Sequence, residues 1–186
     1  MKRRVLLRAS AAGLVMAACG GAQTTGAKTG GVQPTSSPTP TPTPAPATKA
    51  TVELTKGGSF TFALRADKAP QTVARFVGKA GSGFYDNLTF HRVEDWVVQG
   101  GDPDGRGTGG GDAPSEYNDL PFALGAVGIA RGSDRAFNND SQFFVVKEDT
   151  PHLNGDYTNF GLVSAAGMDV VKGIKIGDRI KKVTVE

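Results

Sequence analysis

A glycine-rich run at residues 105–111, Gly-Arg-Gly-Thr-Gly-Gly-Gly, is the first candidate for chemistry, because it looks like a nucleotide-binding loop. Such a loop follows a strand and opens a helix. No strand-then-helix pattern surrounds this run, and Pro114 follows it closely. We therefore expect a surface loop here and no nucleotide site.

Four acidic residues in the same stretch could serve as calcium ligands: Asp102, Asp104, Asp112 and Glu116. Their spacing fits no EF-hand, and acidic residues among glycines are typical of solvated turns. A zinc site needs clustered ligands. The chain has only two histidines, His91 and His152, and no cysteine beyond Cys19. We expect neither a metal nor a cofactor.

A catalytic triad would combine Ser133 or Ser141 with one of the histidines, but neither serine stands in a Gly-x-Ser-x-Gly motif. Arg92 remains as a candidate. It lies in residues 88–93, Leu-Thr-Phe-His-Arg-Val, an apolar segment that we expect to form a strand. On this segment alone, an arginine on the solvated face of a sheet is the simpler interpretation. An arginine that acts on a substrate is the alternative.

Composition divides the chain near residue 50. The first 49 residues contain no aromatic and no acidic residue but six Lys and Arg. Residues 50–186 hold fifteen Lys and Arg against eighteen Asp and Glu, so this part is mildly acidic. The basic character of the whole chain thus belongs to its N-terminal part, and we expect no nucleic-acid partner. Residues 50–186 are long enough for one domain, which we expect to be a monomer.

Residues 1–18 have the three parts of a signal peptide. Basic residues are followed by a modestly apolar run, 9–18, that ends in two alanines. Residues 15–19, Val-Met-Ala-Ala-Cys, resemble a bacterial lipobox, in which Cys19 would be lipidated and become the mature N-terminus; a plain signal peptide is the alternative. Residues 3–8 also resemble a twin-arginine signal, so the general and twin-arginine export routes both stay open. We expect an extracytoplasmic lipoprotein.

Residues 19–49 read as a linker. They are rich in Gly, Ala, Thr and Ser and end in alternating Thr and Pro. With almost nothing apolar to bury, they cannot offset the entropy of ordering, so we expect a disordered tether. Thr-Pro repeats favour extended polyproline II at about 3.1 Å per residue.

The rest of the chain predicts many short strands and two helices. Pro70 opens a helix with Val73, Phe76 and Val77 on one face, which ends at residues 81–83. A second, short helix is expected at 168–172. The expected strands are 59–64, 88–93, 96–99, 126–130, 142–146, 160–163 and 180–185. This pattern favours a small antiparallel β-barrel or sandwich.

Four separated motifs carry a resemblance. They are Phe-His-Arg-Val at 90–93, Gln-Gly-Gly-Asp at 99–102, Gly-Thr-Gly-Gly at 107–110 and Ser-Gln-Phe-Phe at 141–144. In this order they look like the signature of the cyclophilins, and the resemblance covers residues 51–186. It implies a closed eight-stranded antiparallel β-barrel capped by two α-helices. It also implies peptidyl-prolyl cis/trans isomerase activity on proline-containing segments of unfolded proteins, and the predicted signal peptide points to exported proteins among them.

The resemblance also assigns roles. Arg92 matches the catalytic arginine, whose guanidinium would draw the prolyl nitrogen lone pair out of amide resonance and so lower a barrier of about 18–20 kcal/mol. Gln99 would orient Arg92 and the substrate. The other positions that match substrate-binding residues are Trp96, Val97, Thr108, Ala130, Arg131, Gly132, Gln142, Phe144, His152, Leu153 and Tyr157.

Several positions depart from the family's pattern. The stretch between Arg92 and Gln99 is one residue short, and Trp96 replaces the usual Phe. Arg131 stands where many members have Asn, and His152 where cyclosporin-sensitive members have Trp. The alternative to an isomerase is a binding module that holds proline-containing segments with little turnover. Such a module would need the apolar slot but not the arginine.

Overall fold

The computed structural model describes residues 47–186. The predicted signal peptide, Cys19 and the predicted linker up to residue 46 lie outside this range. The first strand includes Lys49, the last residue of the predicted linker, and Ala47 packs against the core. None of the helices in the described range is long and apolar enough to cross a membrane.

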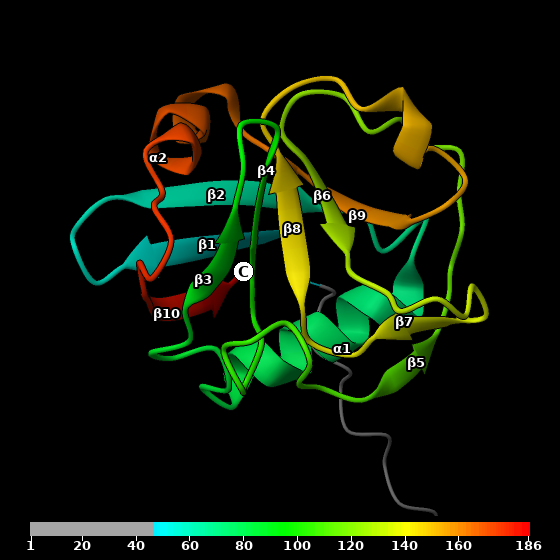
Figure 1. The fold of residues 1–186 in the computed structure, drawn as a ribbon, viewed down its shortest axis with the longest axis horizontal. Helices are drawn as coiled ribbons and strands as arrows, with labels where there is room; N and C mark the ends of the chain where they lie inside the picture. The colour runs from blue at the N-terminus through cyan, green and yellow to red at the C-terminus, as the bar shows by residue number, and fades with distance from the viewer. Residues whose placement is uncertain (1–46) are drawn as a thin grey trace, which may run out of the picture. The chain divides into compact units, whose positions relative to one another are not determined.

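Eight strands form one antiparallel, nearly closed barrel, as the resemblance predicted (Figure 1). In their order around the barrel they are β10 (Ile180–Val185), β1 (Lys49–Leu54), β2 (Ser59–Leu64), β9 (Thr158–Val163), β6 (Ala126–Ile129), β8 (Phe143–Val146), β4 (Val97–Gly100) and β3 (Phe90–Val93). A separate pair, β5 (Asp112–Pro114) and β7 (Phe137–Asn139), lies outside the barrel sheet.

The two edge strands, β3 and β10, approach each other where the barrel closes. An isolated antiparallel bridge joins Thr89 to Arg179, and the Phe90 N–H donates to the Asp178 carbonyl at 2.8 Å. The Ile180 N–H donates to the Leu88 carbonyl at 2.9 Å. These bonds satisfy backbone groups that an open sheet edge would leave unpaired.

Two α-helices cover the barrel, α1 (Pro70–Gly81) and α2 (Met168–Lys172), both within the predicted bounds. In Figure 1, α1 crosses below the barrel strands and α2 lies at the upper left. Helix α1 buries Val73, Phe76 and Ala80, and its N-cap residue, Ala69, makes no side-chain capping hydrogen bond. The Glu116 carboxylate accepts the backbone N–H groups of Gln71 and Thr72 instead, at 3.0 and 2.6 Å.

Two buried clusters lie on opposite sides of the barrel wall. The interior cluster holds most of the aromatic residues, including Phe62, Phe76 and Phe143. The outer cluster consists of Val97, Phe122, Ala126, Phe144, Val146 and Leu153. Because side chains alternate along a strand, Phe143 of β8 points inward while Phe144 points outward, as predicted. The outer cluster forms the base of a surface pocket.

Candidate active site

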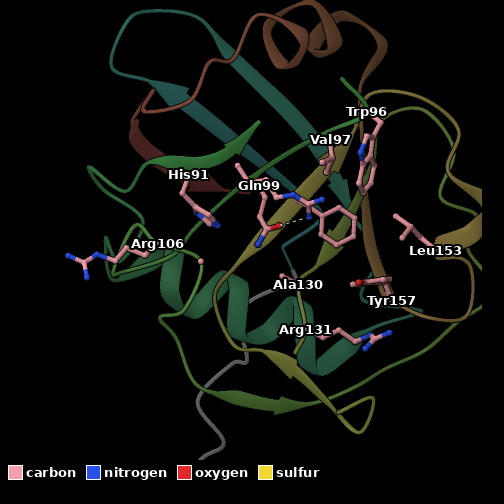
Figure 2. A pocket seen from close by; sticks show the side chains of 12 residues that line it. His91, Trp96, Val97, Gln99, Arg106, Ala130, Arg131, Leu153 and Tyr157 are labelled. Atoms are coloured by element: carbon pink, nitrogen blue, oxygen red, sulfur yellow. Dashed lines mark hydrogen bonds between the residues drawn. The ribbon is translucent and has the colours of Figure 1, made fainter. Parts of the chain in front are cut away.

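A pocket of about 380 Å³ lies against the outer cluster (Figure 2). Strands β3, β4, β6 and β8 and the segments that follow them supply its walls. The residues that line it are His91, Arg92, Trp96, Val97, Gln99, Arg106, Gly107, Ala130, Arg131, Phe144, Leu153 and Tyr157. Nine of the thirteen residues predicted to contact substrate are therefore brought to one cavity.

The apolar part of the pocket is built around Phe144. Its ring stacks on Phe122 at 5.6 Å between centroids and meets the edge of Tyr157 at the same distance. Gly128 of β6 makes this possible, because a Cβ there would lie 2.3 Å from Phe144 Cζ. Val97 and Leu153 complete a buried apolar slot.

Arg92 lies at the pocket and is held from both sides. Its Nε donates to Glu94 Oε1 at 2.6 Å, and Trp96 Nε1 donates to Glu94 Oε2 at 2.8 Å. The Arg92 guanidinium carbon also lies 5.2 Å from the centre of the Trp96 ring. Hydrogen bonding from Arg92 lowers the pKa of Glu94. The short turn between β3 and β4 thus creates a clamp that fixes the direction of the guanidinium.

A chain of side-chain amides leads from Arg92 into the barrel wall. Arg92 Nη1 lies 3.5 Å from Gln99 Oε1, and Gln99 Nε2 donates to Gln142 Oε1 at 2.9 Å. Gln142 Nε2 donates to the Gly109 carbonyl at 2.8 Å. The bonds fix which end of the Gln99 amide faces Arg92.

A second, more polar pocket of about 250 Å³ adjoins the first, and Gln99, Ala130 and Arg131 line both. Three further predicted substrate-binding residues line only this second pocket: Thr108, Gly132 and Gln142. His152 lines neither of the two. It is exposed, and its ring centre lies 5.9 Å from that of Trp96, at the flank of the slot.

The loop that follows β4 depends on Asp102, and here the prediction of a solvated turn is wrong. Asp102 is 1 % exposed. Its carboxylate accepts the backbone N–H groups of Asp104, Arg106, Gly107 and Gly109. Burial raises the pKa of Asp102, but these bonds outweigh burial and leave the pKa below its usual value. Asp102 therefore holds the loop that carries Arg106 and Gly107 to the pocket.

His91, next to Arg92, lines the pocket but was not predicted to belong to the site. Both of its ring nitrogens are buried and have no hydrogen-bond partner among residues 47–186. Burial lowers the pKa of His91, and the negative charge of Asp102 opposes this only in part. The folded chain therefore favours neutral His91.

The low pKa of His91 predicts a stability that depends on pH. Below about pH 6.5, the usual pKa of histidine, the unfolded chain takes up a proton that the folded chain resists. The melting temperature should therefore fall as the pH is lowered from 7.5 to 5.5, and His91→Phe should flatten this slope. His152→Phe, which changes the other histidine of the chain, is the control and should keep it. A slope that persists unchanged in His91→Phe would show that another group causes it.

Sequence reasoning missed four residues that line or shape the pocket: His91, Glu94, Arg106 and Gly107. His91 and Gly107 lie inside motifs that resemble the cyclophilin signature, next to residues matched to the site. Their position in the sequence could therefore have indicated that they line the pocket. Glu94 and Arg106 lie in a shortened turn and a glycine-rich loop, and no periodicity indicates where such side chains point.

The arrangement joins an apolar slot to a fixed guanidinium that presents several donors in a rigid fork. This combination suits a substrate with an apolar ring next to a group that accepts a hydrogen bond, as in an X–Pro peptide bond. Among the described residues, no group of three or more His, Cys, Asp or Glu side chains is placed to hold a metal ion.

Comparison with known proteins agrees with this chemistry. Residues 50–186 match the family model described as cyclophilin type peptidyl-prolyl cis-trans isomerase/CLD. Peptidyl-prolyl cis-trans isomerase B of Bacillus subtilis is 44% identical over 139 residues, which cover 72% of this chain and 94% of that protein. A peptidyl-prolyl cis-trans isomerase of Synechococcus elongatus is 40% identical over 142 residues, 74% and 96% of the two chains.

A solved structure shows the same fold. A cyclophilin type isomerase of Cryptosporidium parvum, crystallised in the presence of the dipeptide Ala-Pro, matches with a TM-score of 0.67 at 26% identity and covers 74% of this chain and 98% of that chain. Family model, relatives and fold all agree with the pocket. The chain therefore belongs to the cyclophilin-type peptidyl-prolyl cis-trans isomerases, and its reaction is the rotation of X–Pro peptide bonds.

Proposed function

We propose that this isomerase acts outside the cytoplasmic membrane on proline-containing segments of exported proteins, held to the membrane by a lipid on Cys19. Arg92 is the residue that drives the rotation. The position of Arg92 supports this role. It is held by Glu94 at the edge of the slot formed by Val97, Phe144 and Leu153.

The proposed mechanism needs no covalent step. Amide resonance between the carbonyl and the prolyl nitrogen makes the barrier to rotation. With the proline ring in the slot, an N–H of the Arg92 guanidinium donates to the prolyl nitrogen as the bond twists and its lone pair becomes available. This hydrogen bond is strongest at the twisted geometry, so it stabilises the transition state more than the ground state.

Gln99 supports the mechanism through position. Its amide oxygen faces Arg92 while its amide nitrogen is fixed by Gln142. The guanidinium is thus held between Glu94 and Gln99 before a substrate binds. Preorganised donors of this kind need no rearrangement at the moment of reaction, which is the source of their effect on rate.

The proposed location rests on the sequence of residues 1–19. Cys19 is the only cysteine in the chain, and it follows Ala17 and Ala18 at the end of the apolar run. A single acyl chain binds membranes only marginally, so stable anchoring needs more than one chain on the processed cysteine. The Thr- and Pro-rich residues between Cys19 and the barrel would then act as a spacer.

Cys19→Ala tests the anchor. When the full chain is expressed in a bacterium, the wild-type protein should fractionate with membranes, and mass spectrometry should find acyl groups on the mature N-terminal cysteine. The Cys19→Ala variant should appear in the soluble fraction or remain unprocessed. A variant that is processed and still fractionates with membranes would contradict the anchor while leaving the isomerase activity unaffected.

A further inference from the structure

The charge of the pocket contrasts with the charge of the domain around it. Residues 50–186 carry more acidic than basic residues. Of the residues that the structure describes, three arginines, Arg92, Arg106 and Arg131, and no carboxylate line the pocket of about 380 Å³. A cavity lined by one sign of charge concentrates ligands of the opposite sign.

The three arginines differ in what already neutralises them. Arg92 forms an ion pair with Glu94 at 2.6 Å. Arg106 is exposed, and in Figure 2 its guanidinium points away from the cavity. Arg131 lies at the edge of the pocket below Tyr157 in the same view. Among residues 47–186 neither Arg106 nor Arg131 forms an ion pair with a carboxylate, but Arg131 is the one held beside the cavity, against Tyr157, so its charge is the better placed for a ligand.

Arg131 is held in place by groups that leave its charge unbalanced. Its Nε donates to the Asp156 carbonyl at 2.7 Å, and Nη1 donates to the Gly132 carbonyl at 2.9 Å. Its guanidinium carbon lies 4.7 Å from the centre of the Tyr157 ring. The Asp156 carboxylate is held by Arg135 at 2.5 Å. A guanidinium has five N–H donors, so donors remain after these two bonds.

We propose that Arg131 selects substrates with an aspartate or glutamate close to the isomerised proline. The proposal rests on the isomerase activity of this pocket and adds a preference among its substrates. Arg131 borders the cavity that holds the proline slot, so a side chain next to proline lies within its reach. The adjoining second pocket contains Asp112, which would repel such a carboxylate, so the acidic side chain is directed to the first pocket.

The size of the expected preference follows from the surroundings of Arg131, where the ion pair with the substrate carboxylate would form. Arg131 is partly buried and already oriented, so it loses little freedom when it binds a carboxylate. Bonds between charged groups are worth more than neutral ones, whereas solvent screening weakens exposed pairs. We expect kcat/KM for a glutamate peptide to exceed that for its glutamine counterpart by about three- to thirtyfold. The ratio should shrink as salt is raised.

Four peptides test the proposal with the full chain. Two carry Glu or Gln immediately before proline, and two carry Glu or Gln immediately after it. Wild-type protein should turn over both glutamine peptides and should prefer glutamate at one or both positions. In Arg131→Gln the ratio of kcat/KM for the glutamate peptide to that for the glutamine peptide should fall towards one. Because the measured quantity is a ratio within one variant, a general loss of activity does not imitate the effect.

Arg75→Gln is the matched control, since it removes the same charge from helix α1 outside the pocket, and it should keep the wild-type preference. Arg131→Lys keeps the charge and should keep part of the preference. Equal rates for glutamate and glutamine peptides at both positions would overturn the proposal, as would a preference that survives in Arg131→Gln. Failure to turn over any of the four peptides would instead contradict the isomerase activity.

Discussion

Arg92→Ala is expected to lower kcat/KM for an X–Pro peptide by about a hundred- to a thousandfold, the usual effect of removing one preorganised donor from a transition state. The free energy of unfolding should change by about 0.5 kcal/mol or less. Arg92 is exposed, and its ion pair with Glu94 is exposed as well. A protease-coupled isomerisation assay and urea unfolding measure the two quantities.

Two variants sharpen this test. Arg92→Lys keeps the positive charge but loses the planar fork, so its activity should fall between those of the wild type and Arg92→Ala. Arg75→Ala removes an arginine from helix α1 and should leave both quantities unchanged. If Arg92→Ala keeps nearly full turnover, Arg92 is a surface charge and the proposed mechanism is wrong.

Asp102→Ala should cause a large loss of stability, about 3–5 kcal/mol in the free energy of unfolding. It removes the acceptor of four backbone N–H groups in the loop, among them the buried N–H of Gly109. Activity should fall too, because the loop brings Gly107 to the pocket wall. Urea unfolding monitored by Trp96 fluorescence measures the stability.

Asp104→Ala is the control for this change. Asp104 lies in the same loop but is exposed, so its replacement should cost about 0.5 kcal/mol or less. The lowered pKa of Asp102 adds a second check. The contribution of ionised Asp102 to the free energy of unfolding is present above the usual aspartate pKa of about 3.9. It is lost as the pH falls through the lower pKa that Asp102 has in the folded chain. If Asp102→Ala and Asp104→Ala cost the same, the bonds to Asp102 do not hold the loop.

Periodicity located most of the barrel but not all of it. Strands β2, β6, β8 and β10 were predicted because apolar and polar residues alternate or apolar residues run together there. Strand β1 was missed although Ala50, Val52 and Leu54 alternate, since it follows the linker directly and its pairing with β2 and β10 is not visible in the sequence. β5 and β7 have three residues each, too few for any pattern.

The residues of the candidate site that could be predicted are those at positions matching the cyclophilin motifs. Val97 and Phe144 point outward because side chains alternate along a strand, and Leu153, from the short helical turn Pro151–Leu153, packs with them in the outer cluster. Asp102 and Glu116 could not be assigned, because their partners are backbone N–H groups whose positions depend on loop conformation. The clamp of Arg92 by Glu94 depends on the shortened turn between β3 and β4, for which the motifs offer no guide.

NMR exchange spectroscopy on an Ala-Pro peptide tests most directly whether the X–Pro bond rotates while the peptide is bound. With the purified chain present at a small fraction of the peptide concentration, cross-peaks between the cis and trans forms should appear at mixing times well below one second. Free peptide exchanges over tens of seconds and shows none. If the resonances of the peptide shift on binding while cis and trans still exchange at the rate of the free peptide, the chain binds proline peptides without isomerising them.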